Sequence, residues 1–186
     1  MSAWPEFNNN GTVYDLSHLH PKTMKITREA TDSHPSKDVR IFLSYSDHCF
    51  TDHYGEDDSW IYTNAQGYKT RYFCRERYEY SFEIDNILKR VFRDNVYITR
   101  TMNEKKEQFF YLDVNTLFCD FRLFLEIEKH HKQDHDVWMK VVSAHPEKPY
   151  ANPVGGDYFK VWRVMDARQS NIELPPRRNG RRGRGR

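Results

Sequence analysis

Hydrophobic and polar residues alternate most clearly over residues 39–45. Val39, Ile41, Leu43 and Tyr45 fall on one face of an extended chain, because successive side chains of a strand point to opposite sides. The pattern therefore predicts a strand with one face in a core. Such a strand carries the residues that follow Tyr45 to one end of a sheet.

A helical repeat follows Ser81, in which apolar residues recur at intervals of three and four. They are Ile84, Ile87, Leu88, Val91 and Phe92. Ser81 is a favourable N-cap, and basic residues near the far end match the negative end of the helix dipole. We predict one principal helix at about residues 82–93, whose apolar stripe needs a sheet to cover.

Short alternating segments make up most of the remaining chain. They cover residues 60–63, 68–73, 96–102, 107–113, 122–128, 138–144 and 158–165. The first two flank Asn-Ala-Gln-Gly, which is typical of a hairpin, and Arg71, Phe73 and Arg75 would then share one face. Together with the helix, these segments predict an α+β fold with a mainly antiparallel sheet.

Length and composition favour a single domain with tails. The chain has 186 residues, and although only 38% are hydrophobic, 15% are aromatic and can supply a core with large rings. We expect a flexible N-terminal arm over residues 1–12 and a single α+β domain over residues 13–170. Residues 171–186 are predicted to be a disordered Arg/Gly-rich tail, because nothing apolar follows Leu174.

The charge of the chain is unevenly distributed. The formal net charge is +2, but residues 175–186 contain six arginines and no acid. The rest of the chain holds 23 basic and 27 acidic residues, a balance of −4. An acidic body argues against a broad DNA-coating surface, so any contact with nucleic acid should be local or made by the tail.

Arginine/glycine tracts bind RNA and phosphates without sequence preference. The tail residues predicted to bind nucleic acid are Arg177, Arg178, Arg181 and Arg182. The alternatives are that the tail is a solubilising end or an incidental addition to the chain.

Several features favour a cytoplasmic protein without a membrane segment. Three cysteines without a Cys-x-x-Cys spacing do not form the regular even set of a secreted disulfide scaffold. No apolar run is long enough to span a bilayer, and the N-terminus lacks a basic-then-apolar signal. His18 and His20, and the histidines of the 129–137 loop, lack further ligands at defined spacing. We therefore predict no metal and no cofactor.

Two neighbouring stretches carry the candidate chemistry. His48 follows the 39–45 strand, and Arg75, Arg77 and Tyr78 lie in a run rich in arginine and aromatic residues. Histidine transfers protons near neutral pH, and arginine presents a fork of donors suited to phosphate. We predict that these four residues form a catalytic cluster, with Arg71 in contact with nucleic acid. The alternative is that the arginines pair with nearby acids while the tyrosines cover a sheet.

A second pair of polar residues lies at the end of the 138–144 strand. Ser143 and His145 are two residues apart, so they share a face of an extended chain. We predict that His145 assists catalysis and that Ser143 contacts nucleic acid. The alternative is that this is simply the point where a strand meets a proline turn.

Four segments of the chain resemble an uncharacterised family of small bacterial proteins carried on accessory and mobile DNA. They are Tyr14-Asp-Leu-Ser, Asp47-His-Cys-Phe-Thr51, Arg71-Tyr-Phe-Cys-Arg-Glu-Arg-Tyr78 and Val141-Val-Ser-Ala-His-Pro146. The resemblance covers roughly residues 13–166. Members of that family are sometimes labelled heat-shock or growth-adaptation proteins, and the resemblance implies no mechanism.

A weaker likeness concerns topology. A helix followed by antiparallel strands, with polar residues at a late strand end, is similar to endoribonuclease toxins of the barnase and RelE type, although here strands also precede the helix. The sequence thus leaves two functions open. One is a metal-independent endoribonuclease, since RNA carries its own 2′-hydroxyl nucleophile. The other is a non-catalytic module that binds RNA, another nucleic acid or a protein partner.

Overall fold

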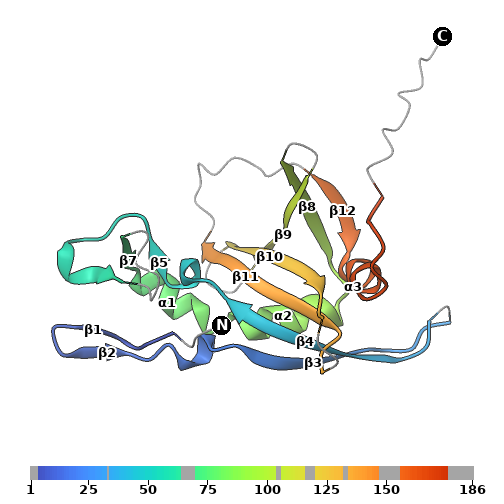
Figure 1. The fold of residues 1–186 in the computed structure, drawn as a ribbon, viewed down its shortest axis with the longest axis horizontal. Helices are drawn as coiled ribbons and strands as arrows, with labels where there is room; N and C mark the ends of the chain where they lie inside the picture. Colours follow the sequence, from blue (N-terminus) through green and yellow to red (C-terminus); the bar gives the residue numbers. More distant parts are fainter. Residues whose placement is uncertain are drawn as a thin grey trace, which may run out of the picture.

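The computed structural model describes residues 4–32, 34–63, 70–103, 106–115, 120–131, 134–146 and 156–175. Twelve strands and three α-helices lie in these ranges (Figure 1). The strands are β1 (Phe7–Asn9), β2 (Thr12–Tyr14), β3 (Lys22–Arg28), β4 (Lys37–Tyr45), β5 (Thr51–Asp52), β6 (Ile61–Tyr62), β7 (Arg71–Phe73), β8 (Tyr97–Asn103), β9 (Lys106–Asn115), β10 (Asp120–Lys129), β11 (Val137–Pro146) and β12 (Asp157–Lys160). The helices are α1 (Arg75–Ser81), α2 (Ile84–Arg93) and α3 (Val161–Gln169), and a 3-10 turn, η2, spans Asp47–Cys49.

Seven strands form the central sheet in the order β12-β8-β9-β10-β11-β4-β3. Neighbours pair antiparallel except β11 and β4, which run parallel. A parallel pair needs a long connection, and here the chain builds α1, α2 and six further strands, β5 to β10, before β11 docks on β4. The α+β class is therefore confirmed, with a mixed central sheet.

The hydrophobic core lies on one face of this sheet. Val39, Ile41 and Leu43 of β4 are fully buried, as their alternation predicts. All five apolar stripe residues of α2 are buried as well. This helix lies against β3, and α3 lies against β10 and β11, so the two cover the same apolar face (Figure 1). Within the described ranges, none of the helices has the length and apolar character to cross a bilayer.

The predicted principal helix is α2, but two further helices were missed. α1 begins at Arg75, directly after β7, where the aromatic residues favoured an extended chain by propensity. The segment 158–165 was predicted to be one strand, yet β12 ends at Lys160 and α3 follows. Val161, Val164 and Met165 are buried on one side of the helix. This packing favours a helix over residues 161–169, because tertiary contacts override β propensity.

Residues near both ends of the described chain pack against the domain. Phe7, in the predicted arm, is buried and stacks on Phe73 with ring centroids 4.5 Å apart. At the other end, Leu174 is buried and its carbonyl accepts a bond of 2.9 Å from Arg100 Nη1. The domain therefore uses residues on both sides of the predicted 13–170 span.

Candidate active site

The turn η2 is fixed to the middle of β11, and this places His48. Ser46 N donates to the Val141 carbonyl at 2.9 Å, and Ser46 Oγ accepts from His48 N at 3.2 Å. Cys49 is fully buried beside the same carbonyl. Because its neighbours are anchored, His48 is held at the strand end, where its side chain stays 42% exposed.

Arg77 reaches this turn from α1. Its Nη1 donates to the His48 carbonyl at 3.1 Å, and its Nη2 lies 2.8 Å from Asp52 Oδ2. The Arg77 side chain is only 12% exposed, so a carboxylate and a carbonyl hold the guanidinium in a partly dry site. His48 and Arg77, which are far apart in the sequence, therefore lie together. These contacts use two of the five N–H donors of Arg77.

His145 lies near the end of β11, the strand that both η2 and α1 contact. Its Nδ1 is 2.8 Å from the Pro146 carbonyl. A carbonyl only accepts, so the hydrogen bond assigns the proton of the neutral ring to Nδ1 and leaves Nε2 unprotonated. The charges of Arg77 and Asp52 both act on this ring. The arrangement thus presents a potential general base.

The two histidines are biased toward the neutral form. Burial lowers the pKa of His48, and the charges of Arg71 and Arg77 lower it further against the opposing effect of Asp47. Burial also lowers the pKa of His145, with the Pro146 hydrogen bond opposing it and Arg77 lowering it further. A neutral imidazole can accept a proton, a protonated one can donate it, and a fixed guanidinium can stabilise an anionic transition state.

Arg71 takes a structural position. It is 4% exposed, its Nε donates to Thr51 Oγ1 at 2.6 Å, and its Nη2 donates to the Thr51 carbonyl at 3.2 Å. The Asp47 carboxylate lies 3.9 Å from the same Nε. Arg71 therefore ties β7 to β5 and η2 and does not present the nucleic-acid surface predicted for it, because its donors face the interior.

Arg75 and Tyr78 also lie apart from the cluster. Residues two apart on a helix point about 200° away from one another, so Arg75 faces away from Arg77. Arg75 lines a separate cavity of about 490 Å³ with Cys74 and Glu79. The Tyr78 ring contacts other aromatic rings of the N-terminal region, including Tyr14 at 5.4 Å. The helix α1 divides a set of residues that an extended chain would have kept together.

The remaining predicted residues divide into two groups. Ser143 pairs with Phe124 and His145 pairs with Arg122 across β10 and β11, so all four side chains share the sheet face opposite the core. The tail arginines lie outside the described residues: Arg177, Arg178, Arg181 and Arg182.

An aromatic cluster on this second sheet face was missed in the sequence. The Phe124 ring lies 5.9 Å from His145 and meets Phe109 edge-on at 5.2 Å. Tyr111 lies 6.0 Å from Phe124, and the Arg122 guanidinium sits 5.5 Å over the Tyr111 ring. The alternation of β10 could have indicated this cluster. Because residues 123 and 125 face the core, residues 122 and 124 must lie on the other face of the sheet.

The acids of the cluster were missed for a different reason. Asp47 is the first residue of η2, and Asp52 follows the turn at the start of an acidic stretch that predicts only a loop. In the structure they pair with Arg71 and Arg77. Their role depends on α1 and β7 folding back onto η2, which no local pattern indicates.

Comparison with known protein families matches residues 6–168 to the YjaZ family. No curated protein and no solved structure matches the chain.

Proposed function

The chain belongs to the YjaZ family, and we propose that it is a metal-independent endoribonuclease with an acid–base site at His48 and His145. One observation carries the proposal. Arg77, fixed by Asp52 and the His48 carbonyl, is carried by α1, which packs against both η2 with His48 and β11 with His145. A fixed cation near acid–base groups suits a reaction that builds negative charge on phosphate.

The proposed reaction uses the 2′-hydroxyl of RNA as its nucleophile. His145 Nε2 accepts the 2′-hydroxyl proton while the 2′-oxygen attacks the neighbouring phosphorus. The bond from phosphorus to the 5′-oxygen breaks, and His48 in its protonated form gives a proton to that oxygen. The products are a 2′,3′-cyclic phosphate and a 5′-hydroxyl. Asp47, 3.9 Å from His48 Nε2, favours this protonated form, although burial and the charge of Arg71 lower the pKa of His48 overall, so the step should be faster below neutral pH.

Arg77 and the aromatic cluster have separate roles in this scheme. The donors of Arg77 not used by Asp52 and His48 would contact the non-bridging phosphate oxygens. Phe124, beside His145, would stack on an unpaired base, as aromatic rings do in proteins that bind single strands. Single-stranded RNA is therefore the expected substrate.

The wider biology is part of the same proposal. It includes a toxin-like role, carriage on mobile DNA and a fold relation to barnase or RelE. Such a fold relation would fit a site at the end of a strand late in the chain. Fold likeness alone does not assign activity, so the proposal depends on the chemistry of the site. Cytoplasmic action is expected because RNA is the substrate.

A non-catalytic binding module is the second candidate, and one observation favours it. Arg77 already pairs with Asp52, and Arg71 already bonds to Thr51. Carboxylates beside the arginines weaken the attraction for phosphate. In this case the aromatic face around Phe124 would hold a strand without cleaving it.

Cleavage of labelled single-stranded RNA in excess EDTA tests the proposal. We expect wild-type protein to cut, and His48→Gln and His145→Gln each to lose roughly a hundredfold or more in rate, as is typical for acid–base groups. His131→Gln, in the exposed loop after β10, is the matched control and should cut normally. Equal cutting by all four proteins would contradict the assignment, whereas RNA binding without cutting by any would favour the binding module.

A further inference from the structure

A second cavity lies at the opposite end of the sheet from His48. Its volume is about 700 Å³, within the range of small-molecule sites. β4 runs from Lys37, which bonds to a residue of this cavity wall, to Tyr45, three residues before His48. At about 3.3 Å per residue, that strand separates the two regions by roughly 26 Å. The cavity is thus independent of the proposed active site.

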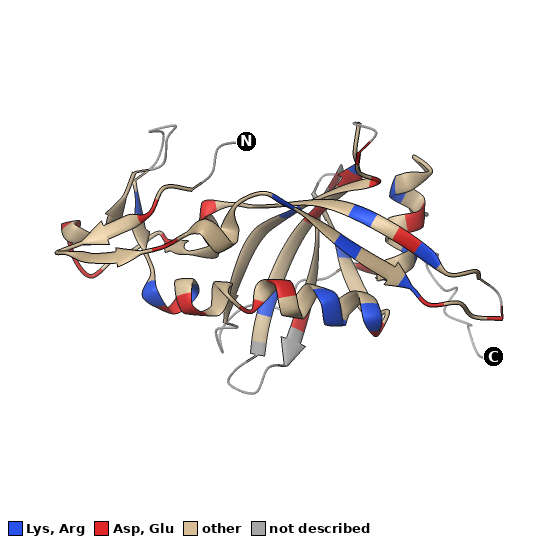
Figure 2. Ribbon diagram, turned by 90° about the horizontal axis from the view of Figure 1, so that it is seen from below, with Lys and Arg blue, Asp and Glu red and all other residues tan. Residues whose placement is uncertain are grey.

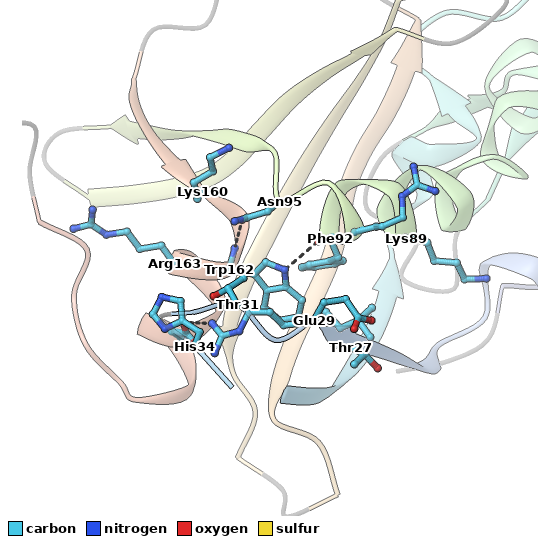
Figure 3. Close-up of a pocket in the computed structure, with 14 residues that line it drawn as sticks. Thr27, Glu29, Thr31, His34, Lys89, Phe92, Asn95, Lys160, Trp162 and Arg163 are labelled. Atoms are coloured by element: carbon cyan, nitrogen blue, oxygen red, sulfur yellow. Dashed lines mark hydrogen bonds and ion pairs between the residues drawn. The ribbon is translucent and has the colours of Figure 1, made fainter. Parts of the chain in front are cut away.

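The cavity wall is basic on a body that is otherwise acidic. Five basic residues line it against the two acids Glu29 and Asp166. The basic residues are Arg28, Lys89, Arg93, Lys160 and Arg163. Figure 3 shows Lys160 and Arg163 on one side of Trp162 and Lys89 on the other, so the cations surround the cavity. Two of them come from the C-terminal half of α2, which is basic in Figure 2.

One of the two acids is already neutralised. Asp166 lies 2.8 Å from Arg28 Nη1 and 3.0 Å from Lys37 Nζ. Burial would raise the pKa of Asp166, but the two cations hold it below its ordinary value. Glu29 is exposed, so solvent and salt screen the effect of its negative charge on the cavity. Arg93 pairs with Asp94, whose carboxylate lies 2.8 Å from its Nε. Within the described residues, Lys89, Lys160 and Arg163 form no such ion pair, so their positive charge is largely uncompensated.

Arg28 also presents an unused donor in the wall. Its side chain is 15% exposed and its guanidinium lies 5.6 Å over the Trp162 ring. Its Nε is buried and lacks a hydrogen-bond partner among the described residues. A buried donor without an acceptor is costly, and a ligand oxygen at this point would satisfy it.

We propose that this cavity binds a small organic polyphosphate of nucleoside-polyphosphate size. Several cations suit several phosphate charges, and the volume exceeds what inorganic pyrophosphate needs. Phe92, Ile26 and Trp162 line the same cavity and supply apolar contact for the organic part. A small molecule is favoured over a nucleic-acid strand because the basic residues surround one cavity rather than form a long stripe.

The peripheral cations have room to turn toward such a ligand. Lys160 Nζ rests 4.2 Å from the Tyr97 ring centre, and the Arg163 guanidinium rests 5.6 Å from that of Phe159. A cation–π contact at an exposed position is weaker than a charge-assisted hydrogen bond to phosphate. Binding should therefore draw both side chains away from their rings.

Isothermal titration calorimetry of the full chain with ATP in EDTA tests this inference. Arg93→Gln and Arg163→Gln both change exposed side chains of the cavity wall, so the fold should be kept. We expect each to weaken binding at least fivefold, and added salt to weaken wild-type binding. Arg90 lies on α2 with Arg93 and is exposed, but it is outside the cavity wall, so the Arg90→Gln variant should bind ATP as wild type does.

Titrations with other ligands identify the class of ligand that the cavity binds. ATP should bind more tightly than tripolyphosphate, because only ATP fills the apolar part. No heat with ATP at millimolar concentration, or equal weakening by Arg90→Gln, would overturn the site. Equal affinity for tripolyphosphate would overturn the organic component, and binding of an RNA oligonucleotide without ATP binding would overturn the small-molecule assignment. His48→Gln should bind ATP normally, which keeps this test separate from RNA cleavage.

Discussion

Replacing Arg77 by Met should both destabilise the domain and change the acid–base site. The change removes the donor 2.8 Å from Asp52 and the donor 3.1 Å from the His48 carbonyl. Hydrogen bonds to charged groups contribute about 1.5–3 kcal/mol each, and breaking a fully buried ion pair costs about 3–5 kcal/mol. The side chains here are 12% and 22% exposed, so the remaining carboxylate gains some water. We expect a loss of about 2–4 kcal/mol.

A double-mutant cycle with Asp52→Asn separates the pair from its surroundings. The amide oxygen that this substitution introduces can still accept a hydrogen bond from Arg77, so the single change should lower the free energy of unfolding by about 1–2 kcal/mol. The cycle should then give a coupling energy between the two positions of about 1 kcal/mol. Urea unfolding followed by tryptophan fluorescence measures all four proteins. Additive effects within about 0.3 kcal/mol would refute the view that Asp52 holds Arg77 in place.

The Arg77→Met substitution should also raise the pKa of His48 and of His145. Arg77 lowers the pKa of His48 and of His145, although burial is the larger cause for each. Removing its charge therefore moves both values upward. NMR titration of the histidine ring protons should show this for both rings, with His131 unchanged as the control. A shift at neither ring would contradict the shared environment.

Three further predictions concern pH, thiol reactivity and packing. The pKa of His48 and of His145 lies below the unfolded value of 6.5, so the unfolded chain binds more protons just under that pH. The free energy of unfolding should therefore fall as the pH drops through 6.5, which urea titrations at several pH values measure. If the fall were smaller in wild type than in the two His→Gln variants, the burial of these rings would be contradicted. Burial raises the pKa of the Cys49 thiol to about 12, so mass spectrometry should find it unalkylated in native protein at pH 8, and rapid alkylation would show that η2 opens. Gly156→Ala should cost about 1–3 kcal/mol, because its Cβ would lie 2.1 Å from the Arg100 carbonyl oxygen, and an unchanged melting temperature would contradict that close approach.

Sequence periodicity predicted the parts of the fold that local pattern determines. The alternation of Val39, Ile41 and Leu43 corresponds to β4, and the stripe around Ile87 and Leu88 corresponds to α2. The helices α1 and α3 were not predicted, because aromatic and β-branched residues favour strands until packing decides otherwise. Strand order, including the parallel β11–β4 pair, depends on long-range docking and has no local signal.

The candidate site was predictable only where residues end a recognisable strand. His48 follows β4 and His145 closes β11, so the ends of two patterned strands indicated both. Arg75 and Arg77 were assigned to one face because the chain was taken as extended, whereas a helix separates them. Asp52 and Phe124 were missed because their contribution depends on what packs beside them.

The most direct test of the proposed activity is a DNA oligonucleotide that contains a single ribonucleotide. The full chain is incubated with it in EDTA, and the products are identified by mass spectrometry. The proposed mechanism predicts one cut, directly 3′ of the ribonucleotide, with a 2′,3′-cyclic phosphate on one product and a 5′-hydroxyl on the other. An uncut oligonucleotide when the matching all-RNA strand is cleaved, or equal cutting of an all-DNA strand, would contradict attack by the 2′-hydroxyl.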